Sequence, residues 1–112
     1  MTRYLLSFHD GAMTFPEEDR PTVAQAAHQV VRAAQEAGEW IFGGGLASQP
    51  TSIVATDGTI TDGPYPPTKE VIGGFAIVDV PSREEALKWA AEFAAGCRCA
   101  QEFREIMYEP LT

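Results

Sequence analysis

The chain has few cysteines and few basic residues, and each shortage excludes a class of protein. Its 112 residues include two cysteines, Cys97 and Cys99. Without a second pair, these build neither a disulfide framework nor a four-ligand zinc site. Eight Lys and Arg stand against sixteen Asp and Glu, which gives a net charge of −8. Because this charge repels a phosphate backbone, we expect no direct nucleic-acid partner.

Long hydrophobic runs are also missing. Nothing approaches the roughly 18 apolar residues of a membrane span, and residues 1–8 lack the small-residue cleavage site of a signal peptide. We therefore expect no membrane association and a reduced, cytoplasmic setting. The glycines at Gly43–Gly45 precede no Lys and Ser or Thr pair of a phosphate loop, and we expect no cofactor and no metal. The length predicts one domain over residues 1–112.

The first helix is predicted from Pro21 and Thr22, which favour a helix start, to Gly38, which favours a left-handed end. His28 falls on the polar side of this helix, where we expect it to be solvated. The apolar side chains that share the opposite face, and that we expect to be buried, are Ala26, Ala27, Val30, Ala34 and Ala37.

A second helix is predicted after Ser82, because Glu85 follows three residues later and completes a capping box. Gly96 is expected to close it. The residues of its inner face are Ala86, Trp89, Ala90 and Phe93.

Six short runs have strand character, and turn residues separate them. Asp57 and Gly58 predict a two-residue hairpin turn, and Gly44 and Gly45 predict a bulge or bend. The strands are expected at 3–8, 39–43, 52–56, 59–61, 71–80 and 103–109. The order of strands and helices predicts an α+β fold, a ferredoxin-like βαββαβ pattern with an added hairpin.

The strand expected at 71–80 is apolar on both sides. Phe75 and Ile77 share one side, whereas the smaller set, which we expect beneath the helices, is Ile72, Gly74, Ala76, Val78 and Val80. Two helices cover only one face of such a sheet. We therefore predict a homodimer in which two sheets close into an α+β barrel.

The most specific block is DGPYPPTKEVIGGF, from Asp62 to Phe75. It resembles the signature of the YCII-related, DGPF-type family of small bacterial proteins, with Tyr65 where that family usually carries Phe. The likeness extends to GGGL at Gly43–Leu46 and SREEALKWAAE at Ser82–Glu92. This resemblance implies a ferredoxin-like subunit that forms a dimeric α+β barrel, in agreement with the pattern of strands and helices.

The same resemblance bears on chemistry. Some members of the broader family look like enzymes of lactone or chlorinated aromatic breakdown, in which a His and Asp pair in the barrel cleft moves protons. His28 lies on the first helix as the family's His does, but residues 93–96 read FAAG where an Asp is expected. DGPF-type members tend to end in Glu, an apolar residue, Arg and Pro. Here Glu109 directly precedes Pro110, so we do not carry over an anchoring role for that Arg.

His9 and Asp62 are the candidate catalytic residues. His9 shares one strand face with Leu5 and Ser7, and histidine is the side chain best able to exchange protons near neutral pH. The alternative for His9 is a local turn contact. Asp62 has the alternative role of accepting backbone hydrogen bonds within its own turn.

Tyr65, Lys69, Glu70 and Phe75 are the candidate ligand-binding residues, because an aromatic and a charged pair converge here beside an apolar strand. Lys69 is a natural anchor for a small carboxylate in an acidic protein. The alternatives are a solvated Lys69 and Glu70 pair and simple packing of the Tyr65 ring.

Two functions stay open on the sequence, and with them the question whether the protein is an enzyme. The first is a homodimer that binds a small, mainly apolar organic ligand in its cleft, with isomerase or lyase activity by proton transfer. The second is a non-enzymatic regulatory or interaction module, because the resemblance extends to DGPF-type proteins associated with alternative sigma factors. An acidic surface suits a basic protein partner.

Overall fold

The computed structural model describes residues 1–47, 51–62 and 71–107. Within these ranges the chain forms strands, two α-helices and a short 3-10 helix. In chain order they are β1 (Thr2–His9), η1 (Glu17–Asp19), α1 (Arg20–Glu36), β2 (Trp40–Gly45), β3 (Ser52–Val54), β4 (Ile60–Asp62), β5 (Ile72–Val80), α2 (Arg83–Cys97) and β6 (Glu102–Glu105). In these ranges, no helix has the length and apolar character needed to cross a membrane.

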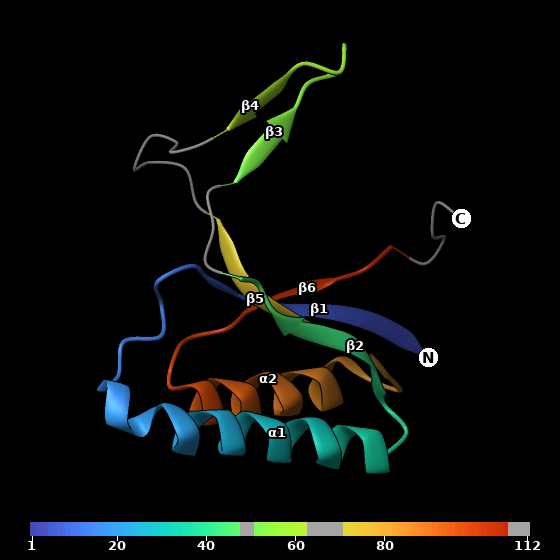
Figure 1. Ribbon diagram of the computed structural model, residues 1–112. Coiled ribbons are helices and arrows are strands. Elements are labelled where there is room, and N and C mark those ends of the chain that lie inside the picture. The colour runs from blue at the N-terminus through green and yellow to red at the C-terminus, as the bar shows by residue number, and fades with distance from the viewer. Residues whose placement is uncertain (48–50, 63–70, 108–112) are drawn as a thin grey trace.

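The main sheet has the strand order β2-β5-β1-β6, with every neighbouring pair antiparallel. This is the ferredoxin-like arrangement, so the predicted α+β fold is confirmed. The helices α1 and α2 lie side by side on one face of the sheet (Figure 1). The added hairpin, β3 with β4, forms a separate two-stranded sheet on the side away from the helices.

The start of α2 has the serine half of the predicted capping box, whereas the Glu85 carboxylate accepts from Lys88. The Ser82 hydroxyl accepts a hydrogen bond from the Glu85 backbone N–H at 3.2 Å. The predicted end was wrong, because the left-handed residue that ends the helix is Arg98, with φ 57°, and Gly96 lies inside the last turn. A Cβ at Gly96 would lie 3.5 Å from the Ala26 backbone. This is ordinary van der Waals contact, so α2 passes close to α1 at Gly96 and an alanine would also fit there.

The helix α1 begins at Arg20, with Pro21 in its first turn, and Gly38 beyond its end has φ 73°. The left-handed position predicted for Gly38 is confirmed. The buried residues of α1 are Val23 and Ala34. Ala37, expected to be buried, is exposed because the helix has already ended there.

Alternation along β5 places Gly74, Ala76, Val78 and Val80 beneath the helices, where they are buried as predicted. The prediction for Ile72 was wrong, and its side chain is 42% exposed. Phe8 pairs with Gly74 and His9 with Ile72, so Gly73 is an extra residue that breaks the alternation.

The bulge expected at Gly44 and Gly45 was also misplaced. Trp40 pairs with Val78 and Phe42 with Ile77, so the extra residue in β2 is Ile41. Gly44 and Gly45 continue the strand in register with β5. The three glycines are therefore regular members of β2. Because they have no side chains, the helix side of the sheet is open at this edge.

The hairpin turn is one residue longer than predicted. The backbone N–H of Gly58 donates to the Ala55 carbonyl at 2.9 Å, and that of Ala55 donates to Thr59 at 2.8 Å. Gly58, at φ 88°, is the left-handed residue that ends this three-residue hairpin loop. The last strand is shorter than expected, and its predicted end at 108–109 lies outside the described residues.

The core fills the layer between the sheet and the helices. Its largest fully buried side chains are Trp89, Leu6, Val78 and Val80, each of which stabilises the fold by roughly 1.5–3 kcal/mol on burial. The indole N–H of Trp89 donates to a Glu39 carboxylate oxygen at 2.7 Å. On the other face of the sheet, Leu5, Phe75 and Ile77 are half-buried.

Candidate ligand-binding cleft

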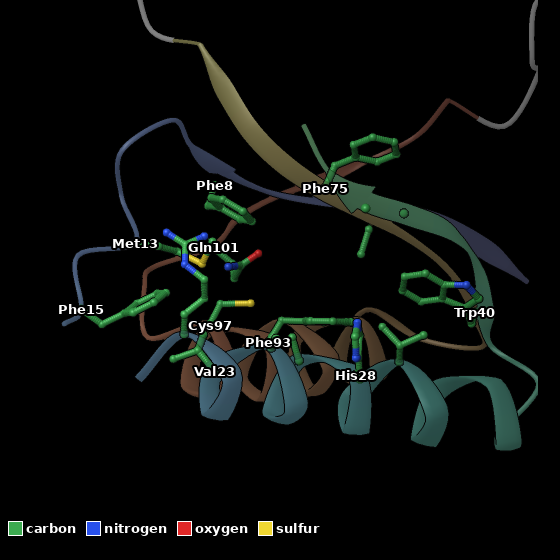
Figure 2. A pocket seen from close by; sticks show the side chains of 18 residues that line it. Phe8, Met13, Phe15, Val23, His28, Trp40, Phe75, Phe93, Cys97 and Gln101 are labelled. Atoms are coloured by element: carbon green, nitrogen blue, oxygen red, sulfur yellow. The ribbon is translucent and has the colours of Figure 1, made fainter. Parts of the chain in front are cut away.

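A cleft of about 440 Å³ opens between α1 and the edge of the sheet formed by β2 and β5. Trp40 closes one end, and Phe8, Met13 and Phe15 surround the other (Figure 2). Phe93 and Cys97 of α2 form its floor toward the core. The cleft thus lies on the helix-covered side of the sheet, whereas the sequence pointed to the uncovered side.

One stripe of α1 forms a wall of the cleft. Its members recur every three or four residues, the spacing that places side chains on one helix face, and they are Arg20, Val23, Ala24, Ala27, His28 and Val31. Val23 is buried, whereas Ala24 and His28 are exposed at the opening. The imidazole of His28 points toward the cleft in Figure 2.

Glycine residues on the sheet keep the opposite wall of the cleft open. Gly43, Gly44 and Gly45 all line the cleft. A Cβ at Gly43 would lie 2.5 Å from the Phe75 carbonyl oxygen, whereas a Cβ at Gly45 would meet nothing within 4 Å. At Gly74, the space of a side chain is filled by the Phe8 ring. Glycine is therefore needed for close packing at Gly43 and leaves free space at Gly45.

Among the described lining residues, the strongly polar side chains are those of Arg20, His28 and Gln101. The Arg20 guanidinium donates two hydrogen bonds to Glu17, at 2.9 and 3.0 Å. These hydrogen bonds and the positive charge lower the pKa of the Glu17 carboxyl. Burial raises the pKa of the Cys97 thiol, with a smaller contribution from Cys99. The thiol therefore stays protonated and is a poor nucleophile.

The two predicted catalytic residues lie on different sheets. The His9 Nε2 is 2.7 Å from a Glu102 carboxylate oxygen, between neighbouring strands on the uncovered face of the main sheet. Asp62 lies in β4 of the hairpin, where its carboxylate accepts a hydrogen bond from the Ser52 hydroxyl. The structure therefore does not bring His9 and Asp62 together.

Of the predicted ligand-binding residues, Phe75 is among those that line the cleft. Its ring points to the other side of the sheet in Figure 2 and packs against Phe42, with ring centroids 5.9 Å apart. Tyr65, Lys69 and Glu70 lie outside the described residues.

A second hollow, of about 430 Å³, lies where the hairpin meets the sheet. Asp10, Leu46, Ser52 and Val71 are among its lining residues. It is a less suitable ligand site than the cleft beside α1, because no aromatic side chain is among its described lining residues.

Sequence reasoning missed Arg20, Trp40 and Gln101 as cleft residues, whereas His28 is exposed as expected and also lines the cleft. A helical wheel for α1 gives one apolar centre, and this centre was assigned wholly to packing. In the structure, α1 packs on α2 near Ala26 and lines the cleft with an adjacent stripe. The i, i+3, i+4 and i+7 spacing from Arg20 was a signal that could have identified this second stripe.

The described ranges contain no group of three or more His, Cys, Asp or Glu residues able to hold a metal ion. Comparison with known families gave a match to the model of the YCII-related domain over residues 3–107. Comparison with curated proteins gave no match.

Proposed function

The chain belongs to the YCII-related domain family, and on this premise we propose that it is a homodimer that binds a small, mainly apolar organic ligand. The ligand lies in the cleft between α1 and the sheet. The observation that carries this proposal is the cleft itself, whose 440 Å³ falls within the range of small-molecule sites. Aromatic and aliphatic side chains and glycine backbone form most of its wall, with a few polar groups to orient the ligand.

His28 is the proposed proton-transfer group. It lines the cleft and is the one imidazole among the described lining residues, and a histidine accepts and donates protons near neutral pH without a metal or cofactor. This supports an isomerase reaction, in which the imidazole takes a proton from one carbon of the ligand and returns it to another, or a lyase reaction. In the lyase reaction the imidazole takes the proton, the C–H electron pair forms a double bond as the bond from the neighbouring carbon to the leaving group breaks, and the imidazolium gives the proton to that departing group. His28→Gln is expected to keep ligand binding and to abolish turnover.

The ligand proposal is tested by analysing what the purified protein carries. Mass spectrometry under native conditions should show the chain with the added mass of a small molecule. Denaturing conditions should release this molecule and leave the mass of the chain alone. Ala24→Phe, which fills the cleft, should lose this molecule. Ala33→Phe is the matched control, because Ala33 is exposed on the same helix and is outside the described lining. Equal retention by both variants would contradict the assignment of the cleft.

The homodimer is proposed to form through the uncovered face of the main sheet, closing the α+β barrel. Leu5, Phe75 and Ile77 are half-buried on this face, and Phe42 is 63% exposed beside Phe75. Light scattering after gel filtration should give twice the chain mass of 12.1 kDa. Phe42→Glu should give the monomer, whereas Leu87→Glu, at an exposed apolar position on α2, should leave the dimer intact.

The uncovered face is also where we propose a role for His9. Its Nε2 lies 2.7 Å from a Glu102 carboxylate oxygen, which orients the imidazole, and we keep His9, Asp62, Tyr65, Lys69 and Glu70 as a second group of candidate residues on the strength of the sequence. Alanine at His9 and at Lys69 should reduce binding or turnover of the identified ligand. Unchanged values for both variants would remove this group from the proposal.

The competing proposal is an interaction module for an alternative sigma factor or another basic protein. The net charge of −8 supports it. A pull-down from native cell extract should recover such a partner if this function holds. Recovery of a small molecule without a protein favours the ligand-binding function.

A further inference from the structure

We propose that the ligand of this cleft is an elongated, singly charged organic acid whose carboxylate binds Arg20. This inference rests on the proposed function and adds the chemical class of the ligand. The chain carries sixteen Asp and Glu, yet none of the 18 described lining residues is acidic and one is Arg. The cleft is therefore a cationic site on an acidic protein, which favours an anion over a cation.

Arg20 retains free hydrogen-bond donors despite its contact with Glu17. A guanidinium has five N–H groups, and Glu17 accepts two hydrogen bonds, from Nε and Nη2. The pair is solvent-exposed, with 68% and 81% of the two side chains accessible, so water screens the attraction and Glu17 does not fix the arginine. The remaining N–H groups form the planar fork that matches a carboxylate.

The length of the ligand follows from the helix. Arg20 and His28 are eight residues apart in α1, which corresponds to about 12 Å along the axis. The wall between them consists of Val23, Ala24 and Ala27. A ligand that reaches both ends therefore separates its carboxylate from its reacting carbon by an apolar segment of roughly this length.

The charge of the ligand is limited as well. With one guanidinium in the described lining, a phosphate or a dicarboxylate at the Arg20 end would carry more negative charge than this end can match. Aromatic rings at Phe8, Phe15 and Phe93 favour an aryl or long alkyl body. The structure thus selects an aryl-alkanoic or fatty acid over nucleotides and sugar phosphates.

The test uses three probes of one shape that differ in charge, namely 4-phenylbutyrate, 4-phenylbutan-1-ol and 4-phenylbutylamine. The readout is the indole N–H signal of each tryptophan in ¹H–¹⁵N spectra. Trp40 lines the cleft, whereas Trp89 is buried in the core and serves as an internal control. We expect the acid to shift Trp40 and to bind about five- to tenfold more tightly than the alcohol, with the amine weakest. Added salt should weaken only the acid.

Three variants assign the charge effect to its residue. Arg20→Gln should lower the affinity for the acid probe about five- to tenfold, to that of the alcohol. The affinity for the alcohol should not change. Glu17→Gln should raise the affinity for the acid probe, because it frees the guanidinium. Arg32→Gln is the control, since Arg32 is exposed on the same helix outside the described lining, and it should change neither probe.

The outcomes separate this inference from the proposed function. If the alcohol binds as tightly as the acid, or if Arg20→Gln weakens both equally, the cleft binds ligands but the assigned class is wrong. If Arg32→Gln weakens the acid as much as Arg20→Gln, the effect is long-range and Arg20 is no anchor. If none of the three probes shifts Trp40, the cleft does not bind such molecules and the proposed function fails with the inference.

Discussion

Replacing Gly43 with alanine tests whether the wall of the cleft is as tightly packed as the structure indicates. A Cβ at Gly43 would lie 2.5 Å from the Phe75 carbonyl oxygen and 2.8 Å from both the Ala76 Cα and the Trp40 Cη2. Two of these three atoms belong to the backbone of the neighbouring strand. They cannot move without opening the β2 and β5 ladder, so we expect the substitution to destabilise the protein.

The magnitude combines two opposing effects. Overpacking of this kind costs about 1–3 kcal/mol. The loss of a glycine stabilises by about 0.4–1 kcal/mol through the unfolded chain. The net expectation is a decrease of about 1–2 kcal/mol in the free energy of unfolding, or about 4–8 °C in melting temperature for a domain of this size.

Gly45→Ala is the matched control. Gly45 faces the same side of β2, two residues away, and an added Cβ would meet nothing within 4 Å. Only the effect on the unfolded chain remains, so stability should stay the same or rise by up to about 1 kcal/mol. Urea unfolding of both variants at one protein concentration measures the difference. A Gly43→Ala variant as stable as Gly45→Ala would refute the packing described for this strand.

Three further predictions concern the caps, the core and the thiols. Ser82→Ala should cost about 1 kcal/mol of unfolding free energy, because the Glu85 N–H loses its acceptor, and Ser82→Asp should restore it. Trp89→Phe should cost about 1–3 kcal/mol in urea unfolding, since it removes the hydrogen bond to Glu39 and leaves space in the core. Cys97 should react with iodoacetamide at pH 8 more slowly than free cysteine by mass spectrometry, because burial raises its pKa and limits access.

Each of these has a clear contrary result. Equal loss of stability in the alanine and aspartate variants of Ser82 would show that the side chain does not act as a cap. A Trp89→Phe variant with unchanged stability would contradict the burial of the indole. Alkylation of Cys97 as fast as that of free cysteine would show that the thiol is exposed and ionised.

The local signals in the sequence were enough to predict the fold. Ser82 and Glu85 mark the start of α2, Gly38 marks the end of α1, and the two-sided apolar strand was correctly assigned its helix side from Gly74 to Val80. These features depend on residues near one another in the chain or on strict alternation, so one sequence suffices to identify them. The predictions were wrong for the end of α2 at Gly96, for the position of the bulge in β2, which lies at Ile41, and for the burial of Ile72. At the two strand positions an extra residue shifts the pairing with the neighbouring strand, which the local sequence pattern does not show.

The amino-acid sequence by itself determined the order of helices and strands and the family, because caps, turns and alternation are encoded over a few residues. Tertiary structure alone decided where the cleft lies. Arg20, Gly45 and Gln101 come from three distant segments and meet only when α1 packs against α2 and stands away from the glycine edge of β2. No spacing rule connects such segments, because their distance depends on how two helices share one face of a sheet.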